Sequence, residues 1–126
     1  MNKYKIEIEI FEGNGGDLEN SSKDAGDPDF AKEGICPWMY RGDGEKSYQQ
    51  GHRFNYPEDI GKMCPWMLDS INSAVRVLSY GGTLPWKYEN TPYLKEIDKD
   101  GVTTEFIRCV DPTDSGIVMK IIRTKL

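Results

Sequence analysis

Residues 64–82 contain the feature that most constrains the fold, a single amphipathic helix with both of its ends marked in the sequence. Pro65 suits the first helical position, where no backbone N–H is needed, and Gly81-Gly82 suits a left-handed stop. The apolar side chains between them recur at the spacing of one helix face; they are Met67, Leu68, Ile71, Ala74, Val75 and Leu78. We expect one main helix over about 64–80 and a sheet that covers this stripe.

The remaining periodic segments indicate strands. Residues 3–11 alternate isoleucines with charged side chains, which is typical of a strand with one buried face. A short strand over 51–56 ends at Pro57, and 93–97 and 102–110 form a predicted hairpin around Asp-Gly. Residues 117–123 are apolar on both faces, which predicts a central strand beside the N-terminal one. The predicted fold class is α+β, a small antiparallel or mixed sheet packed against one main helix.

The 126 residues fit one domain, 1–126, with an acidic Gly/Asp-rich loop at 13–34. A formal net charge of -5 argues against nucleic acid as a partner. No stretch approaches the length of a membrane span, and the start of the chain lacks the apolar region of a signal peptide. Three cysteines, an odd number, in such a chain predict reduced thiols and a cytoplasmic location.

The cysteines are candidate metal ligands. Cys64 falls at or just before the start of the helix, where the dipole and free N–H groups favour a thiolate. Cys36 opens the same tetrapeptide, Cys-Pro-Trp-Met, and Cys109 lies late in a predicted strand. The absence of a Cys-x-x-Cys pair weakens zinc-knuckle and thioredoxin interpretations. Converged in space, the three thiolates fit an iron–sulfur cluster or zinc, with an outside ligand or His52 as the fourth. The alternative is three inert, buried thiols.

Each tryptophan follows a proline, and the three are candidate ligand-binding residues: Trp38, Trp66 and Trp86. A Pro-Trp pair holds a large flat side chain near a turn, so three such pairs can line one pocket. The alternative is that each tryptophan seals a small core.

Acid–base candidates are few. Asp69 lies about one turn into the helix from Cys64, and His52 is the one histidine. Glu58 and Asp59 precede the helix, and their simplest role is to favour its positive end.

The order of the rare residues resembles a small prokaryotic family of uncharacterised proteins. The family pattern has an alternating first strand, a cysteine before a Gly-x-x-Phe strand, Cys-x-Trp opening a helix and Gly-Gly-x-x-Pro-Trp after it. A late-strand cysteine and a Val-x-x-Lys-Ile-x-Arg ending follow. The matching residues span most of 36–124 and are Cys36, Gly51, Phe54, Cys64, Trp66, Gly81, Gly82, Pro85, Trp86, Cys109 and 118–123. The 13–34 loop is longer here, and one late cysteine stands where the family often has an adjacent pair. The resemblance implies this fold and a role for the cysteines, but no particular activity.

The sequence leaves three functions open. The first is a small cytoplasmic accessory or binding protein with a metal or iron–sulfur site, serving a larger redox enzyme or assembling as a homo-oligomer. The second is a small enzyme with Cys64 as thiolate nucleophile, assisted by Asp69 or His52. The third is a structural or interaction domain with inert cysteines. Substrate, metal identity and oligomeric state stay open.

Overall fold

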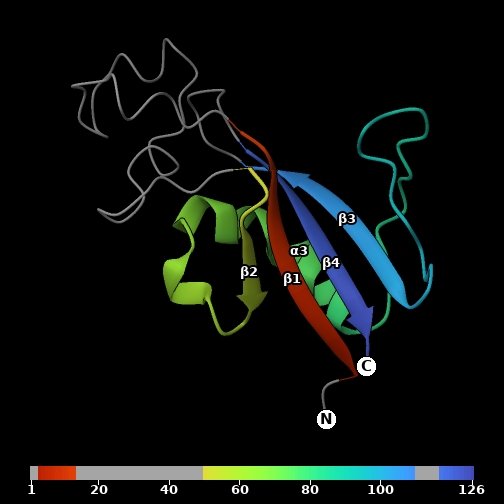
Figure 1. Ribbon diagram of the computed structural model, residues 1–126, viewed down its shortest axis with the longest axis horizontal. Coiled ribbons are helices and arrows are strands. Elements are labelled where there is room, and N and C mark those ends of the chain that lie inside the picture. The colour runs from red at the N-terminus through yellow and green to blue at the C-terminus, as the bar shows by residue number, and fades with distance from the viewer. Residues whose placement is uncertain (1–2, 14–49, 110–116) are drawn as a thin grey trace.

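The computed structural model describes residues 3–13, 50–109 and 117–126 (Figure 1). The remainder, including Cys36, Trp38 and nearly all of the predicted 13–34 loop, lies outside the described residues. In chain order the elements are β1 (Tyr4–Glu12), β2 (Arg53–Tyr56), the 3-10 helix η2 (Ile60–Lys62), α3 (Pro65–Ser79), β3 (Val102–Arg108) and β4 (Val118–Lys125). The predicted α+β fold is confirmed.

The four strands form one antiparallel sheet in the order β2-β1-β4-β3. The predicted central position of the last strand is confirmed, because β4 lies between β1 and β3 and pairs with β1 from Tyr4↔Lys125 to Glu12↔Val118. The start of β1 and the end of β4 lie side by side at one end of the sheet, where the Leu126 N–H donates to the Lys3 carbonyl oxygen at 3.1 Å (Figure 1).

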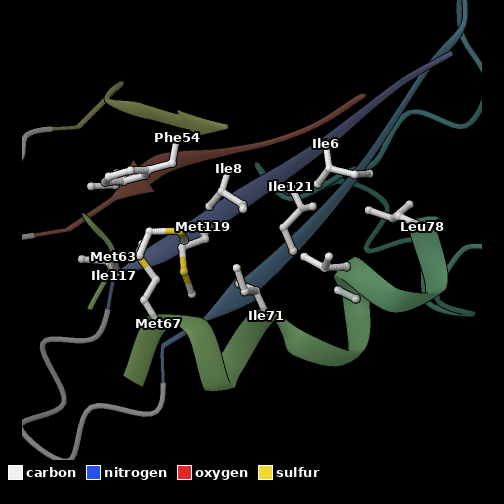
Figure 2. Packing of buried hydrophobic residues seen from close by; sticks show 13 residues of the cluster. Ile6, Ile8, Phe54, Met63, Met67, Ile71, Leu78, Ile117, Met119 and Ile121 are labelled. Atoms are coloured by element: carbon white, nitrogen blue, oxygen red, sulfur yellow. The ribbon is translucent and has the colours of Figure 1, made fainter. Parts of the chain in front are cut away.

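Helix α3 packs on one face of the sheet, and the core lies between them (Figure 2). The sheet supplies Ile6, Ile8 and Ile10 of β1 and Met119 and Ile121 of β4, all buried. The helix supplies the predicted stripe, buried at Met67, Ile71, Ala74, Val75 and Leu78. Each fully buried Ile or Leu contributes about 1.5–3 kcal/mol, so this interface dominates the stability of the fold.

Both predicted helix ends are confirmed. Cys64 is the N-cap in extended backbone, and Pro65 is the first helical residue. Gly81 takes a left-handed backbone, with φ of 87°, at the C-terminal end. Arg123 of β4 completes that end, because its guanidinium donates to the Leu78 carbonyl at 3.1 Å and to the Gly82 carbonyl at 2.9 Å. A cation at this position also offsets the negative end of the helix dipole.

The predicted strand over 93–97 is wrong. Residues 93–98 run beside β3 in irregular backbone, and threonine side chains of β3 accept two of their backbone N–H groups. Thr104 Oγ1 accepts from Glu96 N at 2.9 Å, and Thr103 Oγ1 accepts from Asp98 N at 2.9 Å. The predicted turn is present, since Lys99 and Val102 form an isolated bridge around it. Threonine hydroxyls compete here with the ladder that a regular strand would form.

The face of the sheet opposite α3, here called the outer face, mixes charge with aromatic rings. Arg53 binds Glu9 at 2.9 Å, and its second contact is with Glu7 at 3.8 Å. Among the described residues, no helix is long and apolar enough to cross a membrane.

Candidate functional site: an aromatic hollow on the outer face

A β-bulge in β1 shapes the candidate site. Ile10 pairs with Met119 and Glu12 pairs with Val118, so Phe11 is an extra residue between consecutive partners. A bulge re-aims the side chains beside it. Here Phe11 lies against Phe106, an outer-face residue of β3, with ring centroids 4.9 Å apart.

Phe11, Phe106 and Tyr93 form an aromatic cluster. Tyr93 comes from the irregular segment before β3 and meets Phe11 at 6.1 Å and Phe106 at 5.8 Å, both edge to face. Such pairs contribute about 0.5–1.5 kcal/mol each beyond the area they bury. The cluster therefore fixes the 93–98 segment against the sheet and holds the Tyr93 ring in one place.

The hydroxyl of Tyr93 has a carboxylate and a guanidinium as neighbours. It donates to the Glu12 carboxylate, at 2.9 Å to Oε1 and 2.8 Å to Oε2. This bond, followed by desolvation, raises the pKa of Tyr93 above its ordinary 10.0, while the nearby Arg108 guanidinium acts in the opposite direction. Tyr93 is therefore a neutral phenol near pH 7, suited to hydrogen bonding and unsuited to act as a base.

Tyr88 closes the site from the loop after α3. Its backbone is left-handed, with φ of 54°, which is rare for a bulky side chain and costs on the order of 1–3 kcal/mol. Together with Tyr93, Phe106, Arg108 and Val118 it lines a hollow of about 160 Å³, here called the outer hollow. Three aromatic rings thus surround a space next to one guanidinium.

The two described cysteines are half-buried and free of disulfides. Cys64 and Cys109 both pack against the main core, and Cys64 makes no side-chain cap hydrogen bond. Within the described parts of the chain, no three His, Cys, Asp or Glu side chains gather in a way that holds a metal ion. The predicted three-cysteine site includes Cys36, outside those parts, so the full site stays a prediction.

The predicted tryptophan residues lie on the surface where they are described. Trp66, in the first turn of α3, is 47% exposed, and Trp86, in the loop after it, is 60% exposed. Residues other than these line the outer hollow. The tryptophan pocket stays a prediction, because Trp38 falls in a part of the chain that is not described.

The predicted acid–base residues, His52 and Asp69, belong to other elements than those that line the outer hollow. His52 is exposed just before β2, and its ring centroid is 4.6 Å from that of Phe54. Asp69 is exposed on α3. Neither side chain lines the outer hollow.

A buried polar network lies on the helix side of the sheet. Lys95 Nζ is 2.9 Å from Glu105 Oε2, with the two side chains only 1% and 3% exposed. The Leu84 backbone joins both, since its N–H donates to Glu105 at 2.7 Å and its carbonyl accepts from Lys95. Among the described residues no buried side-chain N or O lacks a hydrogen-bond partner, so the buried charges of this network are fully hydrogen-bonded.

Sequence reasoning missed the residues of the outer hollow. Tyr88 belongs to a loop, and the bulge at Phe11 depends on pairing with β4, which periodicity does not reveal. The available signal was the odd composition of 88–93, where two tyrosines stand among turn-forming residues.

Comparison of the chain with protein-family models, with curated proteins and with solved structures found no match. The resemblance to a small prokaryotic family accordingly stays a prediction.

Proposed function

We propose that this is a small binding protein and that the outer hollow is its ligand site. The observation that carries the proposal is Tyr88, a bulky residue held in left-handed backbone at the wall of the hollow. Backbone strain of this kind persists only where the surroundings enforce it, and it concentrates at binding and catalytic sites.

The lining favours a small planar ligand with one anionic or hydrogen-bond-accepting group. The rings of Tyr88, Tyr93 and Phe106 offer apolar faces and edges. Arg108 contributes a guanidinium, a planar cation of the kind that pairs with carboxylates. Lys120 adds positive charge, with Nζ 6.0 Å from the Phe106 ring centroid. A volume of about 160 Å³ suits a single-ring compound.

Benzoate is a suitable probe. The proposal predicts that benzoate shifts backbone amide NMR signals at Tyr88, Tyr93, Phe106 and Arg108, and that benzamide binds more weakly because it lacks the charge. Shifts confined to other residues, or no shifts with millimolar benzoate, would contradict the proposal.

We propose the cysteine metal site as a second candidate, supported by the position of the two described thiols. The Cys109 N–H donates to the Ile117 carbonyl at 2.8 Å, and Cys64 follows Met63. Met63 and Ile117 lie at the same end of the core, opposite Leu78 (Figure 2). The flanks of the segment that contains Cys36 are at this end too, since Gly51 N donates to Ile10 O at 2.7 Å.

A cluster or zinc at this end would take Cys36, Cys64 and Cys109 as ligands and would suit an accessory protein of a larger redox enzyme. Anaerobic purification followed by metal analysis and a visible spectrum tests this. The candidate predicts bound iron or zinc that the Cys64→Ser variant loses. A colourless, metal-free protein with three titratable thiols would contradict it without affecting the outer hollow.

A further inference from the structure

A second hollow lies at the other end of the sheet. It has a volume of about 440 Å³, and its lining residues are Lys3, Tyr4, Ile6, Tyr56, Pro57, Ser79 and Tyr80. These come from the start of β1, the end of β2 and the end of α3. Tyr4 and Glu12 are eight residues apart on β1, so this strand-end hollow is roughly 25 Å from the outer hollow along the strand. The two sites are separate.

One wall of the strand-end hollow is fixed by packing. The Arg123 guanidinium carbon lies 4.7 Å from the Tyr4 ring centroid. The Tyr4 hydroxyl lies close to Gly81, where a Cβ would come within 3.1 Å of it. Arg123 is itself held by the helix end and by Thr103 Oγ1 at 3.1 Å. The Tyr4 ring is therefore pre-positioned, which lowers the entropic cost of binding against it.

Tyr80 supplies an open part of the lining. Tyr80 is the C-cap of α3, and 91% of it is exposed. A large aromatic residue this exposed gains apolar contact when a flat molecule stacks on it. Tyr56 and Pro57 add further apolar surface, and the volume falls in the range of about 300–1,000 Å³ that is usual for small-molecule sites.

The charges around the strand-end hollow select the sign of the ligand. Lys3 is the only charged residue among the described residues that line it. Arg123 already occupies the Tyr4 ring as a cation–π partner, which disfavours a second cation there. The helix C-terminus would repel an anion, but Arg123 binds the carbonyls of Leu78 and Gly82 and offsets this partial charge.

We infer that the strand-end hollow binds a planar, two-ring aromatic compound with a single anionic group, which stacks on Tyr80 beside the Tyr4 ring with its anion at Lys3. This site is independent of the proposed function, because the outer hollow is lined by different residues at the other end of the sheet.

The test uses three probes of similar size and different charge: 1-naphthoate, 1-naphthylmethanol and 1-naphthylmethylammonium. Backbone amide NMR titrations of the full chain should show shifts at Tyr4, Tyr56, Ser79 and Tyr80. The inference predicts the order of affinity naphthoate, alcohol, ammonium. Equal affinities for the three probes, or naphthoate shifts only around Tyr88 and Phe106, would overturn it.

Matched variants separate charge from stacking. Lys3→Gln should weaken naphthoate binding about threefold and leave the alcohol unchanged, because one exposed charge is removed. Lys5→Gln removes the same charge from β1 outside the lining and should leave naphthoate binding unchanged. Tyr80→Ala should weaken naphthoate and the alcohol roughly tenfold each, because a stacking platform is lost. An unchanged Tyr80→Ala variant, or equal losses in Lys3→Gln and Lys5→Gln, would overturn the inference.

Discussion

The carboxylate of Asp59 accepts a hydrogen bond from the backbone N–H of Asn55 at 2.8 Å, and the N–H of Asp59 donates to the carbonyl of Asn55 at 2.8 Å. Asn55 belongs to β2, the strand at one edge of the sheet. Both of its backbone groups are thus occupied by the turn that follows the strand, and the exposed edge offers fewer free groups to another chain.

The hydrogen bond between the Asp59 carboxylate and Asn55 predicts a loss of stability in acid. The backbone hydrogen bond from Asn55 lowers the pKa of Asp59 below 3.8, with Lys62 and His52 acting in the same direction and desolvation against it. A carboxyl whose pKa is lower in the folded state stabilises the fold above its unfolded pKa and loses this contribution as pH falls through its folded pKa. Urea unfolding at several pH values below 5 should show a smaller acid loss in Asp59→Ala than in the wild type. The control is Glu58→Ala, which removes the same charge from the neighbouring residue and should lose as much stability in acid as the wild type does. Identical pH dependence of the unfolding free energy in all three proteins would contradict the role of Asp59.

The Lys95–Glu105 pair predicts strong non-additivity. Lys95→Met leaves the Glu105 carboxylate buried without its cation, which should lower the free energy of unfolding by about 3–5 kcal/mol. In the double variant Lys95→Met/Glu105→Leu no buried charge is left. Its loss of unfolding free energy should therefore be much smaller than the sum of the losses in the two single variants. A denaturant double-mutant cycle measures this, and additive losses would show that the pair is not coupled.

The contacts of Arg123 predict that lysine cannot replace arginine at this position without a loss of stability. Its guanidinium holds three acceptors, namely the carbonyls of Leu78 and Gly82 and the Thr103 hydroxyl. A lysine ammonium cannot reach all three in this geometry, so Arg123→Lys should cost about 2 kcal/mol of unfolding free energy. Arg76→Lys on the exposed face of α3 is the control and should cost little. Equal effects of the two variants would contradict the capping role of Arg123.

Tyr93 predicts a loss of stability in alkali. Since the pKa of Tyr93 is raised in the folded state, its contribution is fully present below the unfolded value of about 10 and is lost as pH rises through the folded value. The wild type should therefore lose more stability above pH 10 than Tyr93→Phe does. The difference in phenolate absorbance between the two proteins should titrate above 10.0, and a midpoint at or below 10.0 would be inconsistent with the Glu12 bond.

The sequence predicts the elements whose signals are local. The α3 stripe, Pro65 and Gly81 mark the helix within its own residues, and alternation marks β1. The predicted strand over 93–97 is wrong because threonine side chains of β3 accept backbone N–H groups that a regular strand would pair with backbone carbonyls. These threonines lie in another segment, so the local sequence of 93–97 does not reveal them. Lys95 lies within the predicted strand 93–97, and only the fold pairs it with Glu105.

The candidate site depends on distant residues for the same reason. Glu12 and Tyr93 are 81 residues apart, and the bulge at Phe11 exists only against β4. The cysteines and tryptophans are rare and stand in repeated motifs, whereas the lining of the outer hollow consists of tyrosine, phenylalanine, arginine and valine, which follow no sequence motif.

Ligand binding at the outer hollow is tested most directly by the benzoate affinity of two tyrosine variants. Tyr88→Ala removes a wall of the outer hollow and should weaken benzoate binding at least fivefold in an NMR titration. Tyr80→Ala, an equal truncation at the other end of the sheet, should leave the benzoate affinity at the wild-type value. Equal affinities for the wild type and both variants would contradict the outer hollow as the ligand site.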